Sequence, residues 1–317
     1  MPIVVVGNVF VDFKGFPDGA YLPAGRNAGR VEIVHGGVGR NVAEDIANVG
    51  MPTRFVSMVD NTAQGAEVLR NLQNRKVDTQ YVSVVPDGMG IWLAVMDHTG
   101  DVVGSISKRP KMDAMLKLLE EHGDDIFADA ASVIVEIDID DEVARAACRC
   151  AERHRVPVIA LVANMSIALK RRELIQKTRC FICNQQEAGI FFADDFSQLD
   201  PEAMAEELSR RVQAAQLQSM VVTMGSQGAV WADVSGKSGV CPANSVQVCD
   251  TSGAGDAFCA GVSVGLSCGK NLQEACEIGT RLASATITVP ESVCPCFRPQ
   301  ELGLESPDLQ QLSMFEK

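Results

Sequence analysis

The hydrophobic positions of this chain follow two patterns, one typical of buried strands and the other typical of amphipathic helices. Continuous apolar runs predict buried strands at 3–6, 53–58, 132–137, 157–162, 179–183 and 219–224. Apolar residues three and four positions apart predict helices at 42–49, 62–74, 112–121, 140–154, 167–176, from 185, 201–215, 254–268 and 271–287. This alternation predicts an α/β fold with a doubly wound, mostly parallel sheet and helices on both faces.

A second group of strands interrupts this alternation and predicts a small additional sheet. These strands are expected at 9–13, 31–35, 80–85, 91–95 and 103–106, with a loop at 14–30 and a turn at 98–101. We expect the segments at about 9–35 and 80–107 to form a lid on a single α/β domain that spans 1–317. An antiparallel strand is expected at 228–233, and a surface tail with a short helix at about 308–315 follows Pro299.

The charge of the chain argues against nucleic acid or membrane as a partner. Its 317 residues include 28 basic and 41 acidic side chains, for a net charge of -13, whereas nucleic acids and anionic lipids call for basic patches. No apolar run approaches the roughly 18 residues of a membrane span. The segment Met1–Gly7 enters an apolar strand without a basic stretch before it, so we expect a cytoplasmic protein.

The eleven cysteines are interpreted mainly as buried thiols. Two close pairs, Cys180/Cys183 and Cys294/Cys296, leave a zinc or redox protein as an alternative. A zinc site needs four ligands, and the four histidines are isolated from one another. The first pair also lies in an expected strand, where side chains three positions apart point to opposite faces.

A turn at 250–256 carries the strongest chemical signal. Gly253, Ala254 and Gly255 directly precede Asp256 and an apolar helical pattern. Unpaired N–H groups and the helix dipole make such a helix start an anion site. Asp256 stands where it could take a proton from a hydroxyl that attacks a bound phosphoryl group. The alternative is a plain turn, with Asp250 or Ser252 as an ordinary N-cap and Asp256 as a first-turn carboxylate.

Three further stretches surround this candidate centre in the expected fold. Gly36 and Gly37 form a second glycine-rich loop before a helix, and Asp12 follows the first strand. Asn184 and Glu187 could organise a metal–phosphate group, or form a capping box. The stretch 223–228 suits the phosphates or ribose of a nucleotide, or is a simple hairpin turn. Neither a P-loop nor a dinucleotide-binding glycine motif is present in the sequence.

Taken together, these stretches resemble the ribokinase-like (PfkB) family of sugar and nucleoside kinases over about residues 3–290. The segment Gly36-Gly37-Val38-Gly39-Arg40-Asn41-Val42-Ala43 resembles the first family signature, and Asp250-Thr251-x-Gly253-Ala254-Gly255-Asp256 the second. Asn184-x-x-Glu187 and Thr223-x-Gly225 resemble two further family motifs. Their order along the chain also agrees, so the plainer alternatives above become the weaker ones.

The resemblance implies a kinase that uses ATP and Mg²⁺, with Asp256 as the catalytic base. The backbone N–H groups that form the anion hole would come from Gly253, Ala254 and Gly255. Substrate hydroxyls would be held beside Asp12, Gly36, Gly37 and Asn41. ATP and Mg²⁺ would be bound by Asn184, Glu187, Thr223, Gly225 and Gly228. The resemblance further implies K⁺ near Asp250, Thr251 and the loop 284–290, and a homodimer that pairs through the lid.

Within the family the chain looks most similar to pseudouridine kinases, which makes pseudouridine or a ribose-like sugar the expected acceptor. Three stretches depart from the expected pattern. Ser107–Pro110 replaces an Asn-Asp pair, Val162-Ala163 replaces Asp-Pro, and Ile182-Cys183 replaces Lys-Pro. These departures keep open a second hypothesis, that the protein is a non-catalytic sugar or nucleoside sensor on the same scaffold.

Overall fold

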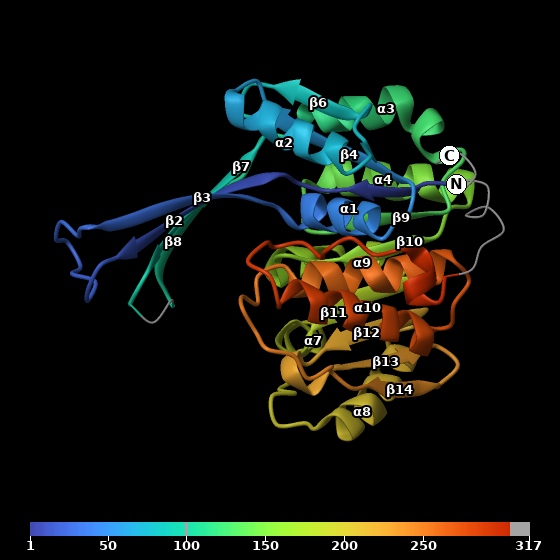
Figure 1. The fold of residues 1–317 in the computed structure, drawn as a ribbon. Helices are drawn as coiled ribbons and strands as arrows, with labels where there is room; N and C mark the ends of the chain where they lie inside the picture. The colour runs from blue at the N-terminus through green and yellow to red at the C-terminus, as the bar shows by residue number, and fades with distance from the viewer. Residues whose placement is uncertain (99–100, 305–317) are drawn as a thin grey trace.

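The computed structural model describes residues 1–98 and 101–304. A large twisted sheet lies between two layers of helices, and a second, smaller sheet projects from one side of this body (Figure 1). The doubly wound α/β fold and the small additional sheet are therefore both confirmed. The helix expected at 308–315 and part of the turn expected at 98–101 lie outside the described residues.

The large sheet is parallel except at one edge. Its order is β14-β13-β12-β11-β10-β9-β1-β4-β5, and β6 also pairs with β4. The parallel strands are β1 (Ile3–Val6), β4 (Thr53–Asp60), β5 (Val77–Asp78), β6 (Val82–Val85), β9 (Ser132–Glu136), β10 (Val158–Leu161), β11 (Cys180–Asn184) and β12 (Ser219–Thr223). The antiparallel edge consists of β13 (Ala229–Asp233) and β14 (Ser238–Cys241).

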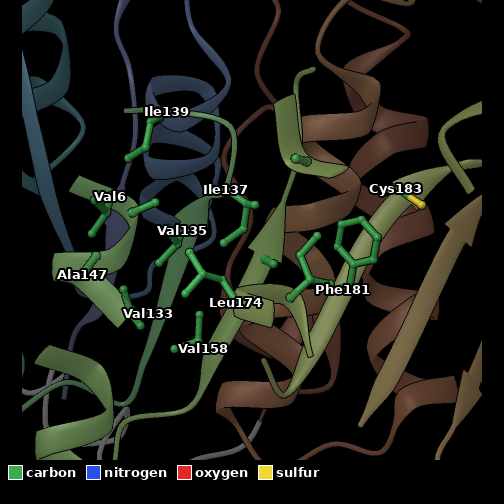
Figure 2. Close-up of a cluster of buried hydrophobic side chains, with 14 of the residues drawn as sticks. Val6, Val133, Val135, Ile137, Ile139, Ala147, Val158, Leu174, Phe181 and Cys183 are labelled. Carbon is green, nitrogen blue, oxygen red and sulfur yellow. The ribbon is translucent and has the colours of Figure 1, made fainter. Parts of the chain in front are cut away.

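Helices cover both faces of this sheet because its strands are apolar on both sides. One face packs against α1 (Val38–Asn48), α2 (Ala63–Asn74), α9 (Ala254–Ser267) and α10 (Leu272–Thr286). The other face packs against α3 (Asp113–Phe127), α4 (Asp141–His154), α7 (Gln185–Phe192) and α8 (Pro201–Ala214). Figure 2 shows this second core, where Val6, Val133, Val135 and Phe181 pack together.

The smaller sheet, which we call the lid, has the order β3-β2-β7-β8. It consists of β2 (Phe10–Pro17), β3 (Gly29–Gly36), β7 (Gly90–Met96) and β8 (Val102–Lys108). Strands β2 and β7 pair in parallel, and each outer pair is antiparallel. The lid is continuous with the body at the ends of β3 and β7, so it stands over the edge where the carboxyl ends of the parallel strands lie (Figure 1).

The structure corrects several predicted elements. Residues 14–17 continue β2 because they pair with β3, although glycine and proline favoured a loop. Residues 82–85, assigned to the lid from the sequence, belong to the large sheet as β6. The helix expected at 167–176 is split into α5 (Met165–Ala168), η1 (Leu169–Arg171) and α6 (Arg172–Ile175). Strand β14 was not predicted, and two further short 3-10 helices are η2 (Gly225–Gln227) and η3 (Pro299–Leu302).

Two helices begin at polar residues whose side chains cap the free backbone N–H groups of the first turn. Thr62 caps α2, and its hydroxyl accepts the Gly65 N–H at 3.3 Å. Asp200 caps α8 in the same way through the Ala203 N–H at 2.8 Å, with Pro201 at the first helical position. Among the described residues, no helix has the length and apolarity to cross a bilayer.

Candidate active site

The turn before α9 has a backbone conformation that requires glycine. Gly253 is the N-cap of the helix and has φ 78°, in the left-handed region. A Cβ atom at Gly253 would lie 1.9 Å from the carbonyl oxygen of Ser292. The loop that contains Ser292 therefore packs directly on this turn. No side chain caps α9. Ala254 N makes one long hydrogen bond, to Thr251 O at 3.3 Å, and the N–H groups of the following residues in the first turn can bind an anion.

Asp256 lies in the first turn of α9, and its carboxylate is bound by an amide from α1. Asn41 Nδ2 donates a hydrogen bond to Asp256 Oδ2 at 2.6 Å. Burial raises the pKa of Asp256 to about 6, against the opposing effects of the Asn41 hydrogen bond and the nearby Arg40 cation. A carboxyl group with this pKa is suited to general base catalysis near neutral pH.

Asp256 opens into a cavity of about 510 Å³ between the lid and the body, which we call the acceptor cavity. Lid residues in its wall include Asp12, Lys14, Trp92 and Ser107. Gly36, the last residue of β3, also belongs to the lid, and the remaining wall includes Gly37, Val38, Asn41, Glu136, Ala163, Asn164, Ser252, Gly253 and Ser292 of the body. All four predicted substrate-side residues, Asp12, Gly36, Gly37 and Asn41, therefore lie in one cavity with Asp256.

Three of these four residues, Asp12, Gly36 and Asn41, have contacts that explain their positions. The carboxylate of Asp12 lies over Gly36, where a Cβ atom would meet Asp12 Oδ2 at 2.5 Å. Burial raises the pKa of Asp12, while Lys14 and Arg40 oppose this shift. The Oδ1 atom of Asn41 is buried and has no hydrogen-bond partner among the described residues. Asn41 thus offers an acceptor to a ligand hydroxyl while its amide nitrogen holds Asp256.

Glu136 is a further acid in this cavity that the sequence argument missed. It ends β9, is 3% exposed, and accepts hydrogen bonds from Asn8 N at 2.9 Å and Asn8 Nδ2 at 3.2 Å. Burial and the neighbouring Asp138 raise the pKa of Glu136 to about 7. A signal was present in the sequence, since an acid at the carboxyl end of a parallel strand stands where α/β folds bind ligands.

A second cavity, of about 660 Å³, lies on the other side of the same turn, and we call it the nucleotide cavity. Asn184, Thr223, Gly225 and Gly228 line it as predicted, together with Thr251, Ala254 and Gly255 of the turn. Apolar side chains also line it, namely Val246, Val248, Phe258, Ala283 and Ile287. A wall that combines hydroxyls and backbone groups with apolar side chains suits a nucleotide, which carries polar phosphates and a flat base.

Asn184 and Glu187 form the capping box that the sequence left as an alternative. Glu187 N donates to Asn184 Oδ1, and Asn184 N donates to Glu187 Oε2, each at 2.8 Å. Asn184 lines the nucleotide cavity, whereas Glu187 is not part of its wall. Burial raises the pKa of Glu187, and Asp138 adds to this shift. The second oxygen of Glu187 and the amide nitrogen of Asn184 remain for a ligand.

The donor set near these residues fits Mg²⁺ better than a metal that needs several protein ligands. Among residues 1–98 and 101–304, no group of three or more His, Cys, Asp or Glu side chains is arranged to hold a metal ion. Mg²⁺ keeps most of its waters and is often held by one or two carboxylates together with substrate phosphates. Glu187, with Asn184 beside it, meets this modest requirement.

The predicted cation residues Asp250 and Thr251 lie at the entrance to the turn. Asp250 Oδ1 accepts the Ser252 N–H at 2.8 Å, and Cys249 N donates to Ile287 O at 2.7 Å. These contacts tie the turn to the end of α10 and to the loop 284–290 that was expected beside it. Thr251 lines the nucleotide cavity.

The pair Cys180/Cys183 does not form a site of its own. Cys180 packs in the core on the α9 face of the sheet and Cys183 in the core on the opposite face, as expected for strand residues three apart. They cannot ligate one ion together. Burial raises the pKa of Cys180 to about 11, which keeps this thiol protonated and unreactive.

Among residues 1–98 and 101–304, the two cavities lie next to each other at the turn that begins α9. Thr251, Ala254 and Gly255 face the nucleotide cavity, while Ser252, Gly253 and Asp256 face the acceptor cavity. A group carried on a ligand in one cavity and a hydroxyl on a ligand in the other would thus meet beside backbone N–H donors and a carboxylate. This arrangement supports transfer of an anionic group between two bound molecules.

Comparisons with known proteins agree with this chemistry. The family model described as pfkB family carbohydrate kinase matches residues 2–295. The chain is 34% identical over 299 residues to a guanosine-inosine kinase of Exiguobacterium acetylicum, covering 92% of this chain and 95% of that protein. A pseudouridine kinase of Escherichia coli (strain K12) is 26% identical over 264 residues, covering 82% of each chain. The expected special likeness to pseudouridine kinases is therefore corrected, since the guanosine-inosine kinase is more similar.

The fold is also found in solved structures. An Arabidopsis thaliana ribokinase complexed with ribose and ATP superposes with a TM-score of 0.79 at 21% identity, covering 96% of this chain and 99% of that chain. This likeness shows that the arrangement of sheet, helices and lid is ribokinase-like.

Proposed function

Because this chain belongs to the pfkB family of carbohydrate kinases, which transfer a phosphoryl group to an alcohol, we propose that it phosphorylates the primary hydroxyl of a purine nucleoside with ATP. The observation that carries this proposal is the pair of cavities that meet at Gly253–Asp256. The similarity to a guanosine-inosine kinase supports guanosine and inosine as acceptors. Family membership further supports a single kinase domain and a cytoplasmic location.

In this proposal Asp256 removes the proton from the attacking hydroxyl, and the N–H groups of Gly253, Ala254 and Gly255 stabilise the charge on the transferred phosphoryl group. Asp12 and Asn41 orient the acceptor hydroxyls above Gly36 and Gly37. Catalysis then comes mainly from positioning and from electrostatic stabilisation.

ATP would occupy the nucleotide cavity, with its phosphates near Thr223, Gly225 and Gly228. Mg²⁺ would bind through waters beside Asn184 and Glu187, where it would neutralise phosphate charge when bound. K⁺ would bind near Asp250 and Thr251, next to the anion hole. Removing Mg²⁺ with a chelator should abolish turnover, and replacing K⁺ with a large organic cation should lower it.

The acceptor is tested by measuring ADP release with ATP and Mg²⁺ across guanosine, inosine, adenosine, pseudouridine, ribose and 2-keto-3-deoxygluconate. We expect guanosine and inosine to give the highest kcat/KM. A preference for ribose or pseudouridine would overturn the purine assignment while leaving the kinase assignment intact. Tight nucleoside binding without ADP release from any compound would favour the sensor hypothesis.

We also propose that two copies pair through the lid, because the two faces of the lid differ in polarity. The row Val34–Asp12–Trp92–Ser107 faces the acceptor cavity. The row Ile33–Phe13–Leu93–Ile106 lies on the other face, where Ile33 is 54%, Leu93 46% and Ile106 69% exposed. A continuous apolar row on an uncovered sheet face is typical of an interface.

The pairing is tested by light scattering on eluted protein. Ile106→Glu should convert a dimer into a monomer, whereas Val234→Glu, at a 48% exposed valine that follows β13, should leave the mass unchanged. A monomeric wild-type protein would contradict the proposal.

A further inference from the structure

Two of the departures from the family pattern meet at one buried carboxylate. Asp138 follows β9 and its side chain is fully buried. Its Oδ1 atom accepts the Ala163 N–H at 2.8 Å, and a proline, which is usual at this position, has no N–H to donate. Its Oδ2 atom lies 3.3 Å from Arg109, within the stretch Ser107–Pro110 that also departs from the pattern. The two departures are therefore parts of one hydrogen-bonded unit.

This unit fixes Arg109 at the wall of the acceptor cavity. One terminal nitrogen of the guanidinium donates to the backbone oxygen of Asp138 at 2.8 Å, and the other donates to its carboxylate. The side chain of Arg109 nevertheless remains 39% exposed. Two of its five N–H donors are thus used, and the structure gives the others no partner among the described residues. Arg109 borders the acceptor cavity and does not border the nucleotide cavity.

Arg109 and Asp256 come from different walls of the acceptor cavity, Arg109 from the chain directly after β8 and Asp256 from the first turn of α9. Asn41, Gly253 and Asp256 gather where the hydroxyl must lie. Arg109 instead follows β8 of the lid, near Trp92 and Ser107, which are directly paired across β7 and β8. An acceptor whose primary hydroxyl is at Asp256 would therefore present another part of its structure to Arg109 in the same cavity.

We infer that Arg109 is a specificity-determining residue that recognises the O6 and N7 acceptors of a 6-oxopurine base, an inference that rests on the proposed nucleoside kinase function. The planar guanidinium presents paired donors, and O6 and N7 of guanine are paired acceptors at matching spacing. Hypoxanthine, the base of inosine, has the same two acceptors. Adenine has an amino group, which is a hydrogen-bond donor, in place of O6. Its amino group would therefore face the N–H donors of Arg109 without an acceptor between them. Asp138 holds the arginine in place for this contact.

The inference is tested with Arg109→Gln, measuring kcat/KM for guanosine, inosine and adenosine. We expect the values for guanosine and inosine to fall about 10- to 100-fold, with little change for adenosine. The matched control is Lys108→Gln, which removes the neighbouring cation paired with exposed Asp87 and should leave all three values unchanged. Equal losses for guanosine and adenosine would overturn the inference and indicate a structural role.

Base analogues add a readout that misfolding cannot imitate. On the wild-type protein, 7-deazaguanosine, which lacks N7, and 2-aminopurine riboside, which lacks O6, should be poorer acceptors than guanosine. In Arg109→Lys, which keeps the charge beside Asp138 but loses the planar fork, these analogues and guanosine should become nearly equal. An undiminished preference for guanosine in this variant would overturn the inference.

The results that would contradict the proposed function differ from those that would contradict this inference. If the wild-type protein phosphorylates only sugars or sugar acids, the nucleoside assignment itself is wrong. If it phosphorylates guanosine but Arg109→Gln and Arg109→Lys keep the full preference over adenosine, only the role of Arg109 is wrong.

Discussion

The nucleotide cavity and the acceptor cavity share one turn but are built in different ways. The nucleotide cavity is formed entirely by the body, from the ends of β11 and β12 and from α9 and α10. The acceptor cavity takes part of its wall from the lid and part from the body, including the acids Glu136 at the end of β9 and Asp256 in the first turn of α9. The shape of the nucleotide cavity is therefore set by the core, whereas the shape of the acceptor cavity depends on the position of the lid. This difference separates residues that support the reaction from residues that select the acceptor.

The largest expected effect comes from Asp256, which lines the acceptor cavity beside the turn where the two cavities meet. Asp256→Asn keeps the shape of the side chain and a partner for Asn41 but cannot accept a proton. Turnover should fall about 10²- to 10⁴-fold, the usual contribution of a general base. The acceptor Kd, measured by calorimetry, should change little. Near-normal turnover would show that another group removes the proton.

Gly253→Ala should damage both sides of the turn at once. The new Cβ atom would lie 1.9 Å from Ser292 O and would force a left-handed conformation on alanine. Loss of the anion hole should lower kcat by about 10²- to 10³-fold. Gly255→Ala is the matched control for folding, since its Cβ atom would meet nothing within 4 Å and the Tm should stay unchanged. Similar kcat values in Gly253→Ala and wild type would contradict the role of the turn.

The pH dependence of kcat/KM tests the roles of Asp256 and Asn41 in the acceptor cavity. Since the base must be deprotonated, kcat/KM should rise with pH through about 6, the pKa of Asp256, and then level off. Asn41→Ala removes a hydrogen bond that stabilises the carboxylate, so this pKa should rise. The loss of kcat/KM should be about 10-fold near pH 6 and smaller near pH 8. A loss of equal size at both pH values would indicate that Asn41 acts only on the substrate.

The smallest expected effect concerns the capping box on the nucleotide side. Asn184→Ala should lower the free energy of unfolding by about 1 kcal/mol, the usual effect of losing an N-cap. Asn271→Ala removes the same kind of box at α10 and should cost a similar amount. Only Asn184→Ala should also raise the KM for ATP. Equal KM values in the two variants would reduce Asn184 to a structural cap.

The nucleotide side and the turn could be predicted from the sequence because their residues lie in short continuous stretches. Gly253–Asp256, Asn184 and Thr223–Gly228 each carry a local signal at a helix or strand end. The same holds for the strands and helices of the body, where apolar periodicity is strong. Strand β6 was assigned to the lid because periodicity identifies a strand without revealing its partner.

The acceptor side could be predicted only in part because its contacts join residues far apart in the chain. Asn41 reaches Asp256 across 215 positions, and Asn8 reaches Glu136 across 128. Arg109 and Ala163 were noticed as departures, but their common partner Asp138 became visible only in the fold. A local sequence pattern does not show which residues far apart in the chain will be in contact.

The central claim, phosphoryl transfer between the two cavities, is tested most directly by identifying the product. The protein should be incubated with ATP, Mg²⁺ and guanosine, and the mixture analysed by ³¹P NMR and mass spectrometry. We predict equal amounts of ADP and a nucleoside monophosphate phosphorylated at the primary hydroxyl, with neither formed by Asp256→Asn. ADP formed without a phosphorylated acceptor, or the same product from Asp256→Asn, would contradict this account.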